Sequence, residues 1–187
     1  NVNCRSGESG MDNNQRFASA ILLDAVAFST FQALDLRATS RIARELGDTT
    51  IAELCAVRAL HLSRQIQLLL WDEAGGIFGD RDMDGQLTGV KAVSGFLPLL
   101  LDETPLARRK RLVQTLQDPQ AFATAFPIPS ISIDNPTWST DLWRGATWVN
   151  MNALVIRGLR KCGYTELAAM LRSTTLAHVA GYYDRYG

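Results

Sequence analysis

Long hydrophobic runs and an excess of charge of either sign are both missing from this sequence. Lysine plus arginine number 19, and aspartate plus glutamate also number 19, so the formal net charge is zero. This balance argues against nucleic acid or an anionic membrane as the main partner, because both attract a basic excess. The longest apolar runs, such as residues 96–101, are far shorter than the roughly 20 residues that a membrane-spanning helix needs. We therefore expect neither a nucleic-acid partner nor a membrane.

Cysteine and histidine are also scarce. The three cysteines, Cys4, Cys55 and Cys162, are odd in number and widely spaced, which excludes a disulfide framework and the usual metal-ligand spacings. The two histidines, His61 and His178, fall within predicted helices, and no serine or cysteine stands in a nucleophile-elbow pattern. We therefore expect no cofactor and no metal, and carboxylates remain as the groups that could carry chemistry.

The length of 187 residues suits one domain with a real core, and we treat residues 1–187 as a single helical domain. The chain begins at Asn1 and shows no signal peptide. Whether it is a processed form or a fragment stays open. The compartment is undetermined as well, and we expect the cytoplasm rather than secretion.

Helical spacing of apolar residues accounts for most of the chain. A helix is predicted from about Leu34 to Leu46, and a long amphipathic helix follows the Asp-Thr cap that begins at Asp48. The remaining predicted helices are a short apolar one in "SGFLPLLL", one with Pro105 in its first turn, one from about Trp148 with Gly163 as its C-cap, and a last one capped by Thr165.

The other segments are rich in turn residues, and polar and aromatic residues gather there. A turn or small hairpin is predicted between Gly75 and Gly89, and three prolines make residues 127–136 irregular. Loops on a rigid scaffold often carry function. Four loop clusters are candidates: Glu8 to Arg16, Asp80 to Asp84, Trp138 to Asn152, and Tyr182 to Tyr186.

The segment "DRDMDG" resembles the start of a calcium-binding EF-hand loop. Asp80, Asp82, Asp84 and Gly85 fit the ligand and turn positions. However, the twelfth position is Lys91, where the loop requires a bidentate glutamate. A hairpin turn is the better interpretation, and calcium binding is the weaker alternative.

Three of the four tryptophans lie within eleven residues, in company with a guanidinium and carboxamides. Flat aromatic faces stack on a pyranose ring, and guanidinium and amide groups hydrogen-bond to its hydroxyls. The alternative is that Trp143 and Trp148 are core packing residues, and both interpretations stay open here. The cluster consists of Trp138, Trp143, Arg144, Trp148, Asn150 and Asn152.

The opening stretch "ESGMDNNQRF" resembles the acid-bearing motif of the clan that joins glycoside hydrolase family 63 with the family 37 trehalases. Further motifs follow in the family's order: "LDLRA", "LWDEAGGIFGDRDMDGQ", "DPQAFATAFPIPSISIDNPTW", "LWRGATWVNMNALVIRGLRKCGY" and "GYYDRYG". The resemblance spans nearly the whole chain, and the order of several motifs makes it specific. The bacterial mannosylglycerate or glucosylglycerate hydrolase branch is the more similar one.

This resemblance implies an all-α fold of the (α/α)6-barrel type, built from six helical hairpins. The helices found here make up about half of that barrel, so the chain resembles its C-terminal portion or a shortened version. Enzymes of this group hydrolyse α-glycosidic bonds with inversion, which requires a carboxylic acid and a carboxylate base with room for water between them. Asp12 matches the general acid, and Asp184 stands where the family has its glutamate base.

The resemblance also implies which residues contact the substrate. These are Glu8, Arg16, Trp143, Arg144, Trp148 and Asn150. Two residues depart from the family pattern. Asp184 is one methylene shorter than glutamate, and Arg37 replaces an asparagine, which predicts a cation near the sugar site.

We therefore expect an inverting hydrolase of a small α-glucoside or α-mannoside, such as glucosylglycerate or mannosylglycerate, or of an oligosaccharide. The alternative is a non-catalytic relic of the family that binds sugar or is merely structural. The expected partner is a carbohydrate substrate. A missing N-terminal segment or a second copy of the chain could complete the barrel.

Overall fold

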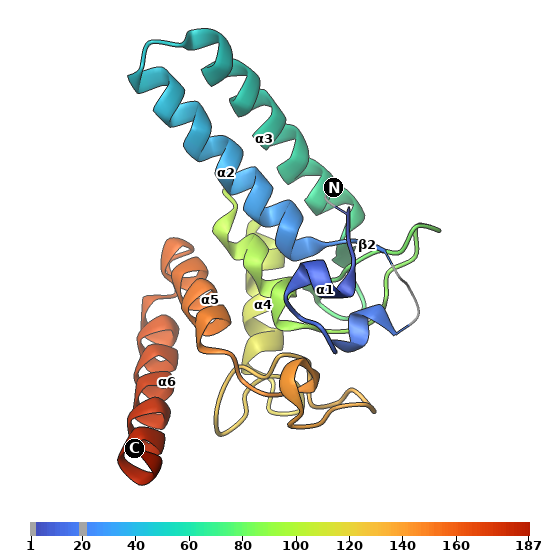
Figure 1. The fold of residues 1–187 in the computed structure, drawn as a ribbon, viewed down its shortest axis with the longest axis vertical. Helices are drawn as coiled ribbons and strands as arrows, with labels where there is room; N and C mark the ends of the chain where they lie inside the picture. Colours follow the sequence, from blue (N-terminus) through green and yellow to red (C-terminus); the bar gives the residue numbers. More distant parts are fainter. Residues whose placement is uncertain (1–2, 19–21) are drawn as a thin grey trace.

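Helices dominate the fold in the computed structural model, which describes residues 3–18 and 22–187 (Figure 1). Two long helices form an antiparallel hairpin, α2 (Val26–Glu45) and α3 (Thr49–Leu69). Asp48 caps α3 as predicted, since its carboxylate accepts a hydrogen bond of 2.9 Å from the Ile51 amide. Among the described residues, no helix combines the length and apolar character needed to cross a bilayer.

Helix α2 begins eight residues earlier than the apolar spacing predicted. The apolar residues that stand at helical spacing in this segment are not all buried, because Ile42 and Leu46 are exposed. The buried positions in this half of α2 are the small residues Ala33, Ser40 and Ala43. Small side chains give weak hydrophobic spacing, yet they allow close helix contact, and the Ser40 hydroxyl donates to the Ala52 carbonyl of α3 at 2.7 Å.

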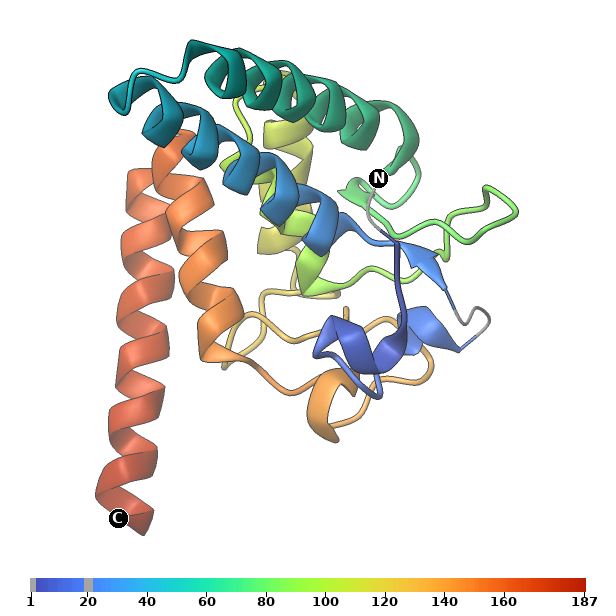
Figure 2. The ribbon, with the colours of Figure 1, turned by 45° about the horizontal axis from the view of Figure 1, so that its top comes forward.

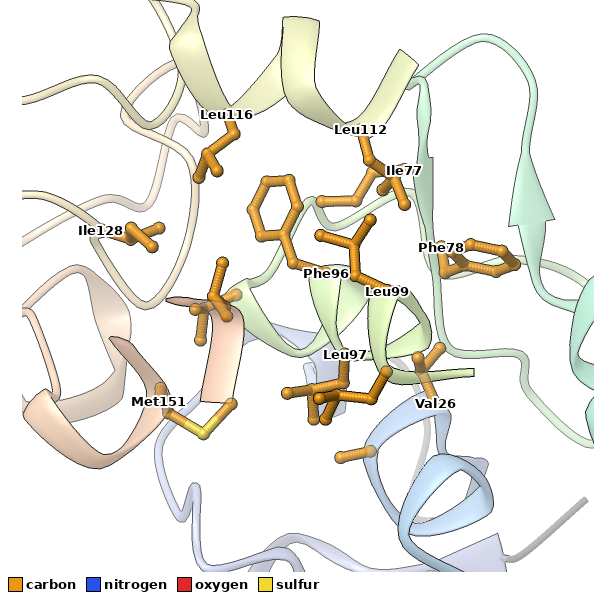
Figure 3. Packing of buried hydrophobic residues seen from close by; sticks show 14 of the residues in the cluster. Val26, Ile77, Phe78, Phe96, Leu97, Leu99, Leu112, Leu116, Ile128 and Met151 are labelled. Atoms are coloured by element: carbon orange, nitrogen blue, oxygen red, sulfur yellow. The ribbon is translucent and has the colours of Figure 1, made fainter. Parts of the chain in front are cut away.

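The centre of the molecule is the 3-10 helix η2 (Val93–Leu100), in which all eight residues are buried. This confirms the short apolar helix predicted from "SGFLPLLL". In Figure 3 its side chains lie between Leu112 and Leu116 of α4 (Leu106–Gln117), Phe78 of β4 and Met151 of α5. Helix η2 therefore joins elements from both halves of the chain into one core.

The predicted hairpin forms, but it starts earlier, with β3 (Trp71–Asp72) paired antiparallel to β4 (Ile77–Phe78). Helix η2 approaches β4 closely at Gly95. A Cβ atom added to Gly95 would lie 2.2 Å from the Phe78 carbonyl oxygen, so only glycine fits there. A second small pair joins β1 (Asn3–Cys4) to β2 (Leu23–Asp24).

The C-terminal third forms a second helical hairpin of α5 (Val149–Lys161) and α6 (Thr165–Tyr186). Gly163 turns the chain between them with φ of +86°, as its predicted capping role requires. Two details differ from the predictions. Thr165 is the first helical residue and makes no cap, and residues 182–186 belong to α6 and form no loop. Pro105 likewise precedes the first turn of α4 as its N-cap.

The remaining elements are short and lie at one end of the molecule. They are α1 (Ser6–Ser9), η1 (Gln15–Phe17) and η3 (Leu142–Arg144). Figures 1 and 2 show α1 beside the long irregular loops that precede α5, while the α5–α6 hairpin forms the opposite side of the molecule. The loops that carry the predicted site residues are therefore gathered at one place, whereas the end of α6 is not.

Candidate active site

Two loops far apart in the sequence lie against each other and form the candidate site. They are the acid loop (residues 8–16) and the tryptophan loop (residues 138–148). The side-chain nitrogen of Asn13 donates to the Asp141 carboxylate at 3.0 Å, across 128 positions of sequence. The side-chain oxygen of Asn13 accepts from the backbone N–H of Trp143 at 2.8 Å. The Arg144 guanidinium donates to the Asn13 carbonyl oxygen at 3.2 Å.

Asn14 makes a second, buried connection between the same loops. Its side-chain nitrogen donates to the Trp143 carbonyl oxygen at 2.8 Å, and its side-chain oxygen accepts from the backbone and Nε of Arg16 at 3.1 and 3.2 Å. Asn14 is 3% exposed, so these bonds are shielded from water. The two loops therefore behave as one rigid unit.

Arg16 holds this unit to the interior of the protein through a buried ion pair. Its guanidinium is 2% exposed and pairs with the buried carboxylate of Asp80 at 2.5 Å. The other oxygen of Asp80 accepts from the Val26 amide at 2.7 Å, at the start of α2, where a helix favours negative charge. Loss of one partner from such a buried pair costs about 3–5 kcal/mol. Arg16 was predicted to contact the substrate, but its guanidinium lies beneath the loop surface.

The same contacts favour the turn interpretation of "DRDMDG" over calcium binding. Asp80 is engaged by Arg16 and the α2 amide, and Asp82 accepts from the backbone amides of Asp84 and Gln86 at 3.0 and 2.8 Å. These carboxylates hold the turn. Within residues 3–18 and 22–187, no group of three or more metal-binding side chains converges.

The tryptophan loop stacks two of its indole rings. Trp143 and Trp148 have ring centroids 3.9 Å apart and planes within 1° of parallel. Trp143 is 7% exposed and belongs to the core, whereas Trp148 is half-buried and donates its indole N–H to the Leu142 carbonyl oxygen at 3.2 Å. Trp143 is therefore a core packing residue, whereas part of the Trp148 ring faces solvent.

Trp138 packs over the same loop and is partly exposed. Gly145 makes this possible, because a Cβ atom there would lie 2.3 Å from the Ser139 carbonyl oxygen and 2.5 Å from the Trp138 indole nitrogen. Leu142 has a φ of +41°, a left-handed conformation that is strained for a leucine. Such strain in a loop held by the acid loop is typical of binding sites.

Asp12 and Glu8 are both exposed on the acid loop. The Glu8 carboxylate accepts from the Arg5 amide at 2.9 Å, so it closes the first turn of α1. Around Asp12 the backbone is fixed, because its carbonyl oxygen accepts from the Ser6 hydroxyl. The neighbouring Met11 is 4% exposed. Asp12 thus presents an exposed carboxyl from an ordered backbone, and Glu8 organises the loop.

The other predicted contact residues lie at the entrance of α5. Arg144 is exposed at the end of η3, and Asn150 is exposed in the first turn of α5, where its side-chain oxygen accepts from the Met151 amide at 2.9 Å. Both follow Trp143 and flank Trp148 in the sequence. Arg144 contacts the acid loop through the Asn13 carbonyl oxygen, and the contact of either residue with a ligand stays a prediction.

The structure does not bring Asp184 to Asp12. Asp184 is exposed near the end of α6, and Figures 1 and 2 both show this end well apart from α1. The cause is the straight course of α6, which continues beyond the loops that it passes. Its role as the base therefore stays a prediction.

Arg37 also lies elsewhere than the resemblance implied. It pairs with Asp102 at 2.9 Å and with Glu103, both just after η2, and Lys161 of α5 adds an ion pair of 2.8 Å to Asp102. The guanidinium is thus neutralised between α2 and the core. Within the described part of the chain, the hydrogen bonds and ion pairs of Arg37 go to Ser63, Asp102 and Glu103, and none of them reaches the acid loop or the tryptophan loop.

Sequence reasoning missed the residues that join the loops. Asn13 and Asn14 were included only as part of the motif from Glu8 to Phe17, and Asp80 was interpreted as an EF-hand position. Two features of the sequence could have indicated such a role. A carboxylate, when buried, requires a cationic or amide partner, and two adjacent asparagines in a loop can hydrogen-bond to distant backbone groups. Neither signal identifies the partner, which the tertiary fold alone supplies.

Comparisons with known proteins identify the family of this chain. A model of the mannosylglycerate hydrolase MGH1-like glycoside hydrolase domain matches residues 5–185. Mannosylglycerate hydrolase from Thermus thermophilus is 33% identical over 110 residues, which are 58% of this chain and 26% of that enzyme.

Solved structures show the same fold. A family 63 mannosylglycerate hydrolase from Thermus thermophilus in complex with glucose superposes with a TM-score of 0.83 and 24% identity, over 94% of this chain and 53% of that one. Neutral trehalase from Saccharomyces cerevisiae gives a TM-score of 0.81 and 16% identity, over 96% of this chain and 35% of that one.

These matches confirm the all-helical class and the partial-barrel architecture expected from the sequence motifs. The chain spans about half the length, or less, of the relatives that it matches. The family model nevertheless covers almost all of it, including the acid loop and the end of α6. The chain therefore belongs to the mannosylglycerate hydrolase MGH1-like family of glycoside hydrolases.

Proposed function

We propose that this chain carries the catalytic residues of an inverting α-glycoside hydrolase. Its substrate is a small α-mannoside or α-glucoside, such as mannosylglycerate or glucosylglycerate, or an oligosaccharide. One observation supports this above the others: Asn13 and Asn14 hold the acid loop and the tryptophan loop as a single unit. That unit puts an acid beside an aromatic and guanidinium surface, as cleavage of a sugar requires.

Asp12 serves as the general acid and gives its proton to the leaving oxygen. Its exposed side chain stands on a backbone that Ser6 and the buried Met11 hold in place, so the carboxyl is both accessible and oriented. Glu8 is engaged with the Arg5 amide and keeps the loop in shape. General acid help of this kind is worth on the order of 10²–10⁴ in rate.

The sugar is held by the tryptophan loop. The partly open ring of Trp148 offers a stacking face, with the buried Trp143 ring supporting it from behind. The exposed guanidinium of Arg144 and the carboxamide of Asn150 supply donors and acceptors for hydroxyl groups. Arg16 contributes indirectly, by fixing the acid loop to Asp80.

Asp184 serves as the base that activates water. An inverting site needs its two carboxyl groups about 6.5–9.5 Å apart. Further polypeptide, either an N-terminal segment or a second copy of the chain, completes the site around the end of α6. Leu176 and Val179, three residues apart on α6, are exposed apolar side chains that such a polypeptide would cover.

A non-catalytic relic is the second candidate. The separation of the Asp184 end of α6 from the acid loop favours it, as does the shorter side chain of Asp184 compared with glutamate. A relic would keep the tryptophan loop for sugar binding or for packing, without turnover.

The test is hydrolysis of a panel of α-mannosides and α-glucosides, including mannosylglycerate and glucosylglycerate, by the purified chain at several concentrations. We expect Asp12→Asn to lose at least about 100-fold in kcat, while the exposed Glu53→Gln on α3 retains full activity. Arg144→Ala should weaken sugar binding, measured by calorimetry. Binding by the wild type without turnover on any substrate would support the relic, and activity that rises steeply with concentration would support completion by a second copy.

A further inference from the structure

One histidine fastens α6 to the loop that precedes the tryptophan loop. The imidazole of His178 stacks on the ring of Phe126 with centroids 4.4 Å apart and planes 13° from parallel. Its Nε2 lies 2.8 Å from the Ala125 carbonyl oxygen, within hydrogen-bond distance. His178 therefore contacts two adjacent residues, with the ring of Phe126 as a flat apolar face and the carbonyl oxygen of Ala125 as a hydrogen-bond acceptor.

His178 is also the last residue of α6 that is even partly buried. Every residue from 179 to 187 is exposed, including Asp184. One turn before His178, the buried Thr175 hydroxyl accepts from the Asn152 side chain of α5 at 3.0 Å, and that side chain also donates to the Pro127 carbonyl oxygen at 2.7 Å. The direction in which α6 leaves the molecule is thus set at positions 175 and 178.

The segment that receives these contacts, residues 125–128, is itself bound to the tryptophan loop. The Thr147 hydroxyl donates to the Phe126 carbonyl oxygen at 2.8 Å, and Thr147 immediately precedes Trp148. Trp148 stacks on Trp143, whose backbone is bonded to Asn13 of the acid loop. A continuous series of contacts therefore leads from His178 to the loop that carries Asp12.

We propose that His178 is a positioning residue that fixes the Asp184-bearing end of α6 relative to the acid loop and the tryptophan loop. Its importance for turnover rests on the proposed function, whereas its effect on the order of α6 does not. The end of α6 beyond residue 178 has no buried side chain to restrain it, so its order depends on this last contact. A small misplacement of a catalytic carboxylate costs about 100-fold in rate for each ångström.

Three variants separate the two parts of the contact. His178→Ala removes both the ring and the donor, His178→Gln keeps an amide donor for Ala125, and His178→Phe keeps the ring that stacks on Phe126. The matched control is His61→Ala, because His61 is the other histidine of the chain, is exposed and lies in the middle of α3. Amide hydrogen exchange of residues 124–128 and 179–186 is measured on the full chain, together with kcat, KM and the melting temperature.

We expect His178→Ala to accelerate exchange in both segments by about tenfold, since local opening is governed by the few contacts that close it. His178→Gln and His178→Phe should each restore part of the protection, and His61→Ala should change nothing. In an active preparation His178→Ala should lower kcat about tenfold or more with KM within about twofold, because the base is misplaced and the sugar contacts are intact.

The outcomes distinguish this proposal from the proposed function. Equal exchange in His178→Ala and His61→Ala would overturn the positioning role, whatever the activity. Altered exchange in a chain whose wild type shows no turnover would uphold the positioning role and reject the hydrolase. A general loss of melting temperature, with exchange raised throughout the chain and no rescue by either conservative variant, would reduce His178 to an ordinary structural residue and also overturn the proposal.

Discussion

At the scale of single residues, the side chains that hold the site in shape differ from those expected to touch the substrate. Asn14 and Arg16 are buried and bonded on several sides, while Asp12, Arg144 and Asn150 are exposed. Exposure leaves the second group available for a ligand. Burial makes the first group sensitive to substitution, because any partner left unpaired loses its hydrogen bond without regaining water.

Asn14→Ala should therefore destabilise the protein. It would leave the Trp143 carbonyl oxygen and the Arg16 donors without their partner, at a cost of about 1–3 kcal/mol in the free energy of unfolding. Urea denaturation measures this loss. Gln32→Ala, at an exposed position of α2, is the control, and equal stability of the two variants would show that the two loops are not held through Asn14.

Asp12 and Glu8 are distinguished by their response to the leaving group. Asp12→Asn should lose far more activity on an α-glycoside with a poor leaving group than on one with a good leaving group, since only the former needs a proton. Glu8→Gln should lower activity on both to a similar extent, through the shape of the loop. Steady-state kinetics with the two substrates checks this, and the opposite pattern would reverse the two assignments.

At the scale of elements, η2 determines how the others pack. Its eight buried residues meet α2, α4, α5 and β4, so its approach to each neighbour must be close. Gly95→Ala should cost about 1–3 kcal/mol or more, because the new methyl group would meet the backbone carbonyl of Phe78. Gly181→Ala in α6 meets open space, so it should gain roughly 0.5–1 kcal/mol. Chemical denaturation of both variants tests the pair, and equal effects would contradict the close approach.

Asp102 connects elements through charge. The hydrogen bond from Lys161 holds its pKa below the usual value of 3.8, with Arg37 and Arg109 acting in the same direction and partial burial opposing them. Because the folded-state pKa is lowered, the stabilisation is present above the unfolded-state pKa and is lost as the pH falls through the folded-state pKa.

Asp102→Asn should therefore lower the melting temperature more at pH 7 than at pH 3, because the stabilisation from the ionised carboxylate declines once the pH is below 3.8. Differential scanning calorimetry at the two pH values measures the change. Glu45→Gln, which removes an exposed acid at the end of α2, serves as the control for net charge. A variant whose melting temperature differed from wild type equally at both pH values would refute the assignment to Asp102 ionisation.

The elements could be predicted from the sequence wherever apolar spacing was strong. The apolar run of η2, the cap of α3 and the glycine after α5 were all identified correctly. The start of α2 was missed because its buried residues after Val26 are alanine, serine and threonine, which give little hydrophobic periodicity. The last helix was predicted from its sequence, but residues 182–186 were also grouped with the loop clusters because tyrosine and charged residues gather there, although they continue a regular helix.

The site was predictable only in part, and for a related reason. The acid loop and the tryptophan loop were both singled out from their residue types. Their contact depends on Asn13 and Asn14 reaching backbone groups more than 120 positions away. Such pairings leave no local pattern in one sequence. The burial of Trp143 and Arg16 likewise follows from packing that motif spacing does not reveal.

At the scale of the whole molecule, the chain combines a well-packed centre with a projecting second hairpin. The α5 helix packs on η2, whereas α6 rests on α5 and is exposed along its final turns (Figure 2). The match covers 53% of the family 63 mannosylglycerate hydrolase structure, so this chain holds about half of that architecture. Cooperation between the carboxylates of Asp12 and Asp184 therefore depends on the complete assembly in solution.

The central claim is that Asp12 and Asp184 serve an inverting reaction, and the stereochemistry of the first product tests it most directly. Proton NMR, recorded during early turnover of an α-glycoside by the wild-type chain, distinguishes the two anomers of the released sugar before they equilibrate. Inversion predicts that the β anomer is released first, because water attacks the face opposite to the leaving group. Initial release of the α anomer would contradict the assignment of Asp184 as a base, and no release at any protein concentration would favour the relic.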